Sequence, residues 1–348
     1  MNYRKLIFAA LVVCAAVSCK KDEDGTITPS LDGALSIVGL PQFVGIYEEV
    51  TLRAKGVSHP DGGELTYTWK VTPSAPTAVE GESFPFEFTD TLQTCTVTCT
   101  ASAEGYSGSS VSAYVTVVKG GKDGSIKGID FPDASFSTPI DDNNDNTYFF
   151  WSIGSQTWML NNVAERSSGK PYENCDIMSN VVGRYYNYNE AIAVCESLAD
   201  ASGQNWVLPT LEDWQTLESY VKSEITADPS KGKSVAAALL GDATFNSNTM
   251  WEYWPAVGDI TNSSKFAAIP AGYAIIKPES SAGKYDLTTY EGVYDYATFW
   301  TVSENENNEN EAYIAYLICG EPGLYFGTRA KESFGASVRC ILRTTDGM

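Results

Sequence analysis

Aromatic residues crowd into two stretches of this 348-residue chain, and acidic residues accompany them. Trp251, Tyr253 and Trp254 fall within four consecutive positions, and a group of tyrosines that includes Tyr294 follows later. A flat ring suits the face of a sugar, whose C–H groups pack on the ring while its hydroxyls bond to nearby acids and amides. The alternative is that these large rings form a core. The predicted ligand-binding residues are Trp251, Glu252, Tyr253, Trp254, Tyr294, Asp295 and Glu304.

Groups that could do catalytic chemistry are scarce. The chain has one histidine, His59, which lies outside the aromatic-rich half and leaves that half without an imidazole for a triad, a general base or a metal. Glu304 and Glu306 belong to an acidic, Asn-rich stretch that is typical of a solvated loop, not of a glycosidase pair. Phosphate-binding glycine loops and nucleotide fingerprints do not occur in the sequence. The sequence therefore predicts a protein that is not an enzyme, with no catalytic residues.

One polar stretch is similar to a calcium loop. Residues 141–145 read DDNND, which places acids and amides at alternate positions. Asn146 stands where such a loop needs glycine, and Ser152 stands where it needs a closing glutamate. Asx turns explain the same composition. We predict no metal site and no cofactor, and calcium is the alternative.

The first residues indicate export. Arg4 and Lys5 precede an apolar run over residues 6–17 that is too short to span a bilayer, so residues 1–18 are predicted to be a signal peptide. Ala16-Val-Ser-Cys19 resembles a lipobox, which makes Cys19 the predicted lipidation site. The charged residues after Cys19 look like the export tag of Bacteroidetes surface lipoproteins. An ordinary secreted protein is the alternative, and residues 19–34 are the predicted tether.

The charge of the chain restricts its partners. Removal of residues 1–18 takes out two basic groups and changes the net charge from −21 to −23. A protein this acidic is expected to repel nucleic acid and anionic membrane surfaces. Neutral sugars or peptides are favoured over phosphate-rich partners.

Residues 35–119 show the pattern of a small all-β domain. Alternating runs at residues 50–54, 65–71 and 94–100, separated by turn residues, predict an antiparallel sandwich. Tyr67-Thr-Trp69 resembles the core strand of PKD-type immunoglobulin-like domains. Such a domain is expected to act as a spacer, with ligand binding as the alternative. The glycine-rich residues 120–124 are the predicted hinge to a second domain at 125–348.

The second domain combines helices with strands. Apolar residues at helical spacing predict one helix over residues 189–199. A second is predicted from the N-cap Thr210 to about residue 225, with Glu212 and Asp213 at its positive end. A third covers residues 233–240. The rest suits strands and long loops, which gives an α+β arrangement.

Six short motifs follow one another in this second domain. They are Ile153-Gly-Ser-Gln-Thr-Trp158, Gly183-Arg-Tyr-Tyr186, Trp206 to Trp214 (WVLPTLEDW), Thr261-Asn262 with Phe266 to Tyr273, Phe299-Trp300 to Glu304, and Gly335 to Cys340 (GASVRC). In this order they resemble the Fibrobacter succinogenes major paralogous (FISUMP) domain over residues 125–345. That family is similar in fold to C-type lectins and formylglycine-generating enzymes, which implies a C-type-lectin-like α+β fold.

The resemblance also assigns structural roles. It implies that the aromatic residues of the motifs build the core, and that Arg339 makes buried hydrogen bonds. The ligand-binding residues are then expected between the motifs. The implied core residues are Trp158, Trp206, Trp214, Phe266 and Trp300.

Six cysteines follow Cys19 in the sequence. Cys95 and Cys99 lie on one face of a predicted strand, about 13 Å apart, and cannot bridge each other. Cys319 and Cys340 are 21 residues apart and do not match the close pair of the formylglycine-generating relatives, so Cys340 is expected in a structural disulfide. Three pairings are open among the cysteines of the second domain, which are Cys175, Cys195, Cys319 and Cys340.

Together these features predict a surface lipoprotein of the outer membrane that captures extracellular glycan, with β-glucan as a candidate ligand, for an uptake transporter. The alternative is an adhesin or fimbria-associated structural protein that binds another protein. A carbohydrate-active or formylglycine-generating-like enzyme is the third hypothesis.

Overall fold

A computed structural model describes residues 28–73, 79–88, 93–119, 126–127, 140–141, 146–277 and 288–343. The chain divides into two compact units, Met1–Lys119 and Gly120–Met348. The predicted signal peptide, Cys19, the hinge at 120–124 and residues 142–145 of the calcium-like stretch lie outside the described residues. In the part of the chain that is described, no helix is long and apolar enough to cross a membrane.

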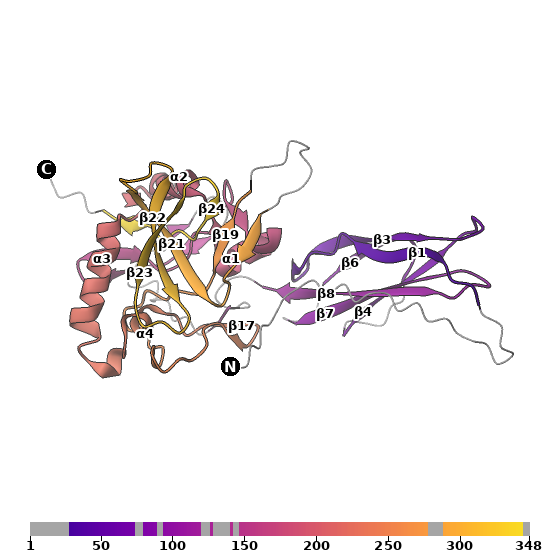
Figure 1. Cartoon of the computed structure of the whole chain (residues 1–348), viewed down its shortest axis with the longest axis horizontal. Coiled ribbons are helices and arrows are strands. Elements are labelled where there is room, and N and C mark those ends of the chain that lie inside the picture. Colours follow the sequence, from indigo (N-terminus) through magenta and orange to yellow (C-terminus); the bar gives the residue numbers. More distant parts are fainter. Residues whose placement is uncertain are drawn as a thin grey trace. The chain divides into compact units, whose positions relative to one another are not determined.

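The first unit is a sandwich of two sheets, which Figure 1 shows as two layers of strands. Strand pairs are antiparallel except β2 and β8, which run parallel. One sheet has the order β1 (Asp32–Val38), β3 (Glu49–Ser58), β6 (Ser83–Glu87), and the other has the order β2 (Phe43–Gly45), β8 (Ser109–Val118), β7 (Thr94–Ser102), β4 (Thr66–Thr72), β5 (Val79–Glu80).

Alternation along the strands explains this sandwich. In β7, Cys95, Val97 and Cys99 are buried, while the threonines between them face outward. The inward residues of both sheets meet in one core around Trp69, whose indole N–H donates to the carbonyl of Gly81 at 2.9 Å. The strands predicted at 50–54, 65–71 and 94–100 are confirmed.

The second unit contains many small sheets and a few helices. A three-stranded antiparallel sheet, β21 (Tyr296–Glu304), β22 (Glu311–Ile318) and β23 (Tyr325–Ala330), is the largest by strand length and lies at its centre in Figure 1. A four-stranded sheet has the order β12 (Phe150–Ile153), β13 (Gln156–Met159), β25 (Ile341–Leu342), β16 (Trp206–Val207).

Short strands complete the second unit. They are β9 (Ile126–Lys127), β10 (Ile140–Asp141), β11 (Thr147–Tyr148), β14 (Lys170–Pro171), β15 (Arg184–Tyr185), β17 (Thr244–Phe245), β18 (Asn248–Thr249), β19 (Tyr273–Ile275), β20 (Thr289–Glu291) and β24 (Phe334–Gly335).

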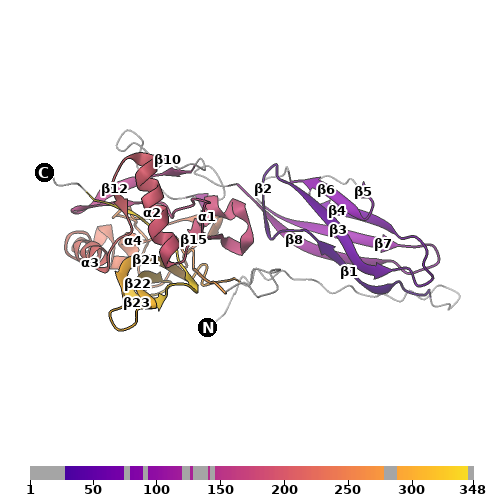
Figure 2. The same cartoon turned by 90° about the horizontal axis from the view of Figure 1, so that it is seen from above.

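The helices start where the sequence predicts. In α2 (Tyr188–Ser202), Asn187 and Glu190 form a capping box, and in α3 (Leu211–Tyr220), Thr210 and Asp213 form another. A π-helical turn, Val221–Ile225, continues α3. The third predicted helix is α4 (Val235–Leu239), and a single helical turn, α1 (Ser179–Val182), precedes β15. Figure 2 shows α2 and α3 from above as separate helices of this unit.

The predicted core residues are confirmed. Trp158, Trp206, Trp214, Phe266 and Trp300 are all buried, and their rings pack in two clusters on either side of the β21–β22–β23 sheet.

Arg339 is buried beside these rings, as predicted. Its guanidinium donates to Asn162 Oδ1 at 2.7 Å, to the carbonyl of Phe266 at 2.7 Å and to the carbonyl of Ala267 at 3.2 Å, and it lies 4.9 Å from the centroid of the Phe266 ring. Burial lowers the pKa of Arg339 to about 9, so the group is still charged at neutral pH. Arg339, in the segment before β25, thereby joins the loop after β13 to the loop at Phe266.

One disulfide resolves the pairing that the sequence left open. Cys195 of α2 bonds to Cys340, next to β25, with a Cα–Cα distance of 5.9 Å. Cys175 and Cys319 remain thiols, and so do Cys95 and Cys99, in agreement with the spacing argument.

Candidate functional site

The two tryptophans at 251 and 254 have opposite environments. Trp251 is 2% exposed and its indole N–H donates to the carbonyl of Ala268 at 2.9 Å, whereas Trp254 is 45% exposed. A ring enclosed by the core cannot stack on a ligand, so the prediction that Trp251 binds ligand is wrong. Trp254 is the tryptophan of this pair that can present a ring surface to a ligand.

Trp254 rests on the turn that follows β22. A Cβ placed on Gly320 would lie 3.2 Å from Cδ2, 3.4 Å from Cε2 and 3.4 Å from Cγ of Trp254. Three ring atoms at nearly equal distance mean that one indole face lies over the glycine. Gly320 also has a φ of +87°, which favours glycine. The glycine therefore lets the ring lie flat on the backbone while the other face stays accessible.

Two acidic residues lie near the Trp254 ring, because both they and the ring contact Cys319. The amide of Cys319 donates to the carbonyl of Asp295 at 2.7 Å, and its thiol contacts the Glu252 backbone and the Trp254 side chain. Burial raises the pKa of the Cys319 thiol, and the charges of Glu252 and Asp295 raise it further, while those two contacts oppose the rise. Trp254, Glu252 and Asp295, all predicted from sequence, thus surround one half-buried residue.

Tyr294 connects this patch to a cluster of tyrosines. Tyr172, Tyr185 and Tyr290 have ring centroids 5.4 to 6.5 Å apart, and the hydroxyl of Tyr290 donates to Asn174 Oδ1 at 2.9 Å. Burial is the main cause that raises the pKa of Tyr172, and Tyr294 is among the neighbours that raise it further. Tyr294 is thus close enough to Tyr172 to act on it electrostatically, while Asp295, the next residue, is bonded to Cys319 beside Trp254.

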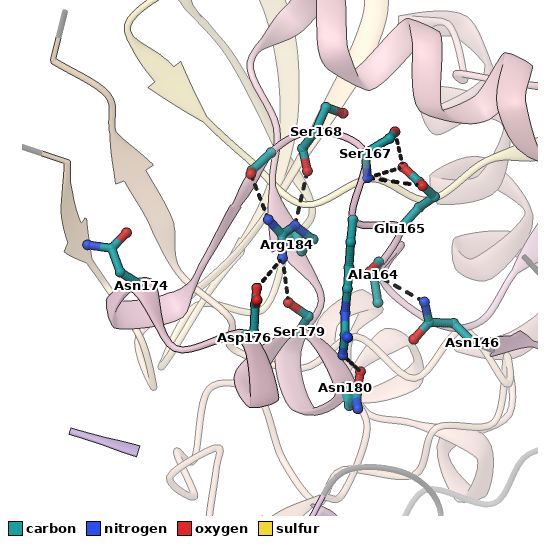
Figure 3. Close-up of polar contacts among 12 residues, drawn as sticks. Asn146, Ala164, Glu165, Ser167, Ser168, Asn174, Asp176, Ser179, Asn180 and Arg184 are labelled. Carbon is teal, nitrogen blue, oxygen red and sulfur yellow. Dashed lines mark hydrogen bonds and ion pairs between the residues drawn. The ribbon is translucent and has the colours of Figure 1, made fainter. Parts of the chain in front are cut away.

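The segment that carries Tyr172 and Asn174 is fixed by Arg184. Its guanidinium donates to the carbonyls of Ser168 and Gly169 at 3.0 and 2.9 Å, and to Ser179 Oγ at 2.9 Å. It also pairs with Asp176 at 3.0 Å. Figure 3 shows these four contacts converging on Arg184, with Asn174 on a turn beyond them. Arg184 therefore has a structural role in this segment.

Left-handed backbone conformations occur at the tyrosine cluster, as they also do at Asn262, Lys265 and Ala267. Glu173, Asn174 and Tyr294 have φ values of 52°, 56° and 72°. Such conformations cost on the order of 1 to 3 kcal/mol each in residues other than glycine and concentrate at functional sites. Glu173 is half-buried, and burial raises the pKa of its carboxyl. Two segments distant in sequence are thus both strained where they meet.

Two other predicted ligand-binding residues, Glu304 and Tyr253, differ from this group in position or in contacts. Glu304 is the last residue of the nine-residue strand β21, whereas Asp295 directly precedes that strand, and Glu304 pairs with Lys331 at 2.6 Å. The hydrogen bond and charge of Lys331 lower the pKa of Glu304. The prediction that Glu304 shares a site with Trp254 is therefore wrong, because its strand carries it to the opposite end. Tyr253 is 67% exposed beside Trp254, and its role stays a prediction.

Sequence reasoning missed Tyr172, Asn174 and Gly320. Tyr172 and Asn174 lie in an irregular segment before α1, and the sequence offers no signal that joins them to Tyr290. Gly320 had a weak signal, because a glycine two residues after a strand is typical of a turn.

The chemistry of this surface is that of recognition. It offers an indole face, two carboxylates and a group of phenol rings, which suit stacking and hydrogen bonding to hydroxyl groups. Within the described ranges, no group of three or more histidine, cysteine, aspartate or glutamate residues could hold a metal ion.

Comparison with known proteins places the second unit. No curated protein matches the chain. The model of the Fibrobacter succinogenes major domain matches residues 152–342, which is more than half of the chain and lies within the range expected from the six motifs. The chain therefore belongs to the Fibrobacter succinogenes major domain family.

Proposed function

We propose that this protein is a lipid-anchored protein of the outer membrane surface that binds a neutral extracellular glycan without cleaving it. Its ligand surface is Trp254 with Glu252, Asp295 and Tyr294. The bound glycan, for which β-glucan is a candidate, passes to an uptake transporter. The lipobox-like sequence at Cys19, the C-type-lectin-like fold that the family resemblance implies and the aromatic surface support this proposal.

The observation that carries the proposal is the environment of Trp254. One indole face rests on Gly320 and the ring is still 45% exposed, so a sugar ring can stack on the other face at little cost in side-chain order. Glu252 and Asp295 are exposed beside it and accept hydrogen bonds from sugar hydroxyls.

Affinity electrophoresis through gels that contain neutral plant, algal or bacterial glycans tests this function. Trp254→Ala is expected to weaken binding by about 1 to 3 kcal/mol, as for other aromatic anchors, which is roughly 5- to 150-fold. Trp151→Ala is a matched control, because Trp151 is also partly exposed, at 36%, but belongs to strand β12, whereas Trp254 lies in a loop.

Three results would count against the proposal. Absence of retardation by every neutral glycan would leave a protein-binding adhesin, for which the neighbouring exposed rings of Tyr253 and Trp254 would be the contact. Equal losses of glycan affinity in Trp254→Ala and Trp151→Ala would show that Trp254 is not part of the ligand surface. Release of shortened products from a bound glycan would replace binding with catalysis.

A further inference from the structure

The outer face of the first unit carries an array of hydroxyl groups. Strands β4, β7 and β8 are neighbours in the five-stranded sheet, and their inward residues build the core. The outward residues of these three strands are Thr66, Thr68, Lys70 and Thr72 on β4, Thr94, Thr96, Thr98, Thr100 and Ser102 on β7, and Ser110, Ser112 and Tyr114 on β8.

Strand register sets these side chains in rows. Thr98 pairs with Lys70 on one side and with Ser112 on the other, and the next row along β7 contains Thr96 and Tyr114. Neighbouring strands are about 4.8 Å apart, and residues on one face repeat about every 6.7 Å along a strand. The face is therefore a regular grid of hydroxyls, which we call the hydroxyl face.

Cross-strand hydrogen bonds use only part of the hydrogen-bonding capacity of these hydroxyls. Thr98 Oγ1 and Ser112 Oγ are 2.8 Å apart, and Thr100 Oγ1 and Ser110 Oγ are 3.0 Å apart. Two hydroxyls together have two O–H donors and four lone pairs, and their mutual bond uses one of each. Threonine pairs of this kind stabilise a sheet, yet each also keeps capacity for a partner outside the protein.

Two further features of the hydroxyl face suit a neutral ligand. Tyr114 is 48% exposed within it, so a large ring stands among hydroxyls without being needed by the core. Among the outward residues of these three described strands, Lys70 alone is charged, although the whole chain has a net charge of −21. A near-neutral surface with one exposed ring does not match a charged partner.

We propose that the hydroxyl face is a second contact surface for an extended neutral polysaccharide, with Tyr114 stacking on a sugar ring and the threonine and serine hydroxyls bonding to sugar hydroxyls. The first unit is then a binding module, not only a spacer. This inference rests on the proposed function in the class of ligand, but on none of the residues around Trp254.

Two weak contacts on one chain reinforce each other when they bind the same polymer. The second contact forms at the effective concentration set by the first, so the whole chain binds more tightly than either surface alone. Loss of either ring is then expected to weaken binding of the full-length protein.

The test uses the full chain in affinity gels that contain a soluble neutral β-glucan or another glycan that retards the wild type. Tyr114→Ala is expected to bind about tenfold more weakly, and the double variant Tyr114→Ala/Trp254→Ala more weakly than either single variant. Tyr47→Ala is the matched control, since Tyr47 is 73% exposed in the same unit but lies outside the hydroxyl face. Circular dichroism establishes that each variant is folded.

The outcomes separate the two proposals. Wild-type binding by Tyr114→Ala, together with a loss in Trp254→Ala, overturns the hydroxyl face and leaves the proposed function intact. A loss in Tyr114→Ala but none in Trp254→Ala supports the hydroxyl face and overturns the Trp254 surface. Equal losses of affinity in Tyr114→Ala and Tyr47→Ala overturn the hydroxyl face, and absence of glycan binding by the wild type overturns both proposals.

As a second variant, Thr98→Val is expected to lower affinity severalfold while preserving the strand.

Discussion

Strand β7 of the first unit and strand β25 of the second both lie inside their sheets, but different interactions hold them there. β7 has eight register pairs with β8 and seven with β4, whereas β25 has two with β13 and two with β16. Because β25 has few strand pairs, its flanking residues provide the other contacts that hold it in the sheet. Arg339 makes buried hydrogen bonds, Cys340 forms the disulfide, and Arg343 pairs with Asp213.

This contrast shows how two β-rich units can differ in their sensitivity to change. A long strand distributes its stability over many equivalent pairs, so one altered pair matters little. A two-residue strand relies on a few specific polar contacts, and each missing partner leaves a buried group unsatisfied. Single substitutions beside β25 should therefore cost far more than outward substitutions on β7.

The largest effect is expected for Arg339→Ala. The carbonyls of Phe266 and Ala267 and the side chain of Asn162 would lose their donor, which should lower the free energy of unfolding of the second unit by about 4 kcal/mol. Urea unfolding followed by tryptophan fluorescence measures this, because seven of the eight tryptophans lie in the second unit. Arg329→Ala is the exposed control, with a loss under about 1 kcal/mol.

Removal of the disulfide comes next. It joins residues 145 positions apart, and a bridge that closes so long a loop restricts the unfolded chain strongly. The double variant Cys195→Ala/Cys340→Ala is expected to lose about 3 kcal/mol in the same unfolding experiment. Cys319→Ala is the matched control, since Cys319 is a thiol. A similar loss in both variants would mean that packing, and not the bridge, sets the stability.

A smaller effect with a defined pH dependence is expected for Asp213→Asn. Burial would raise the pKa of Asp213, but hydrogen bonds and charge from Arg343 and hydrogen bonds from Thr210 outweigh it and lower the pKa. The unfolded chain therefore binds this proton more readily, so the stabilisation, about 2 kcal/mol, is complete above roughly pH 4 and is lost as the pH falls further. Urea unfolding at pH 7 and pH 3 should show the variant and the wild type converging. A constant difference would contradict the ion pair with Arg343.

The smallest effect is expected on β7. Thr98→Val removes a hydroxyl that pairs with Ser112 but keeps the β-branched shape and all the backbone pairs of the strand. The free energy of unfolding should change by under about 0.5 kcal/mol, measured by circular dichroism in urea. A loss comparable to that of Asp213→Asn would remove the contrast between the two strands.

The sequence predicted what periodicity and capping determine. The strands of the sandwich follow from strict alternation, α2 follows from its apolar face, and α3 follows from its apolar face together with the cap Thr210. The roles of the core tryptophans and Arg339 followed from the family resemblance. These features are local or recur in order, so one chain is enough to reveal them.

The candidate site was predictable only in part. Trp251 and Trp254 lie in an irregular segment without a period, so nothing local distinguishes the buried ring from the exposed one. The contact between Tyr290 and Asn174 joins residues 116 positions apart, and the displacement of Glu304 depends on the length of β21. Such long-range features depend on the tertiary fold, and sequence spacing does not report them.

The late position of β25 in the chain has a consequence for how the protein folds. All the described strands of the sandwich end before residue 119, but the sheet of β12, β13 and β16 stays open without residues 341–342. Cys195 likewise needs Cys340 before the disulfide can form. The second unit can therefore complete its fold only when residues 339–342 are in place. A variant truncated shortly before residue 339 should contain a folded sandwich and a protease-sensitive remainder.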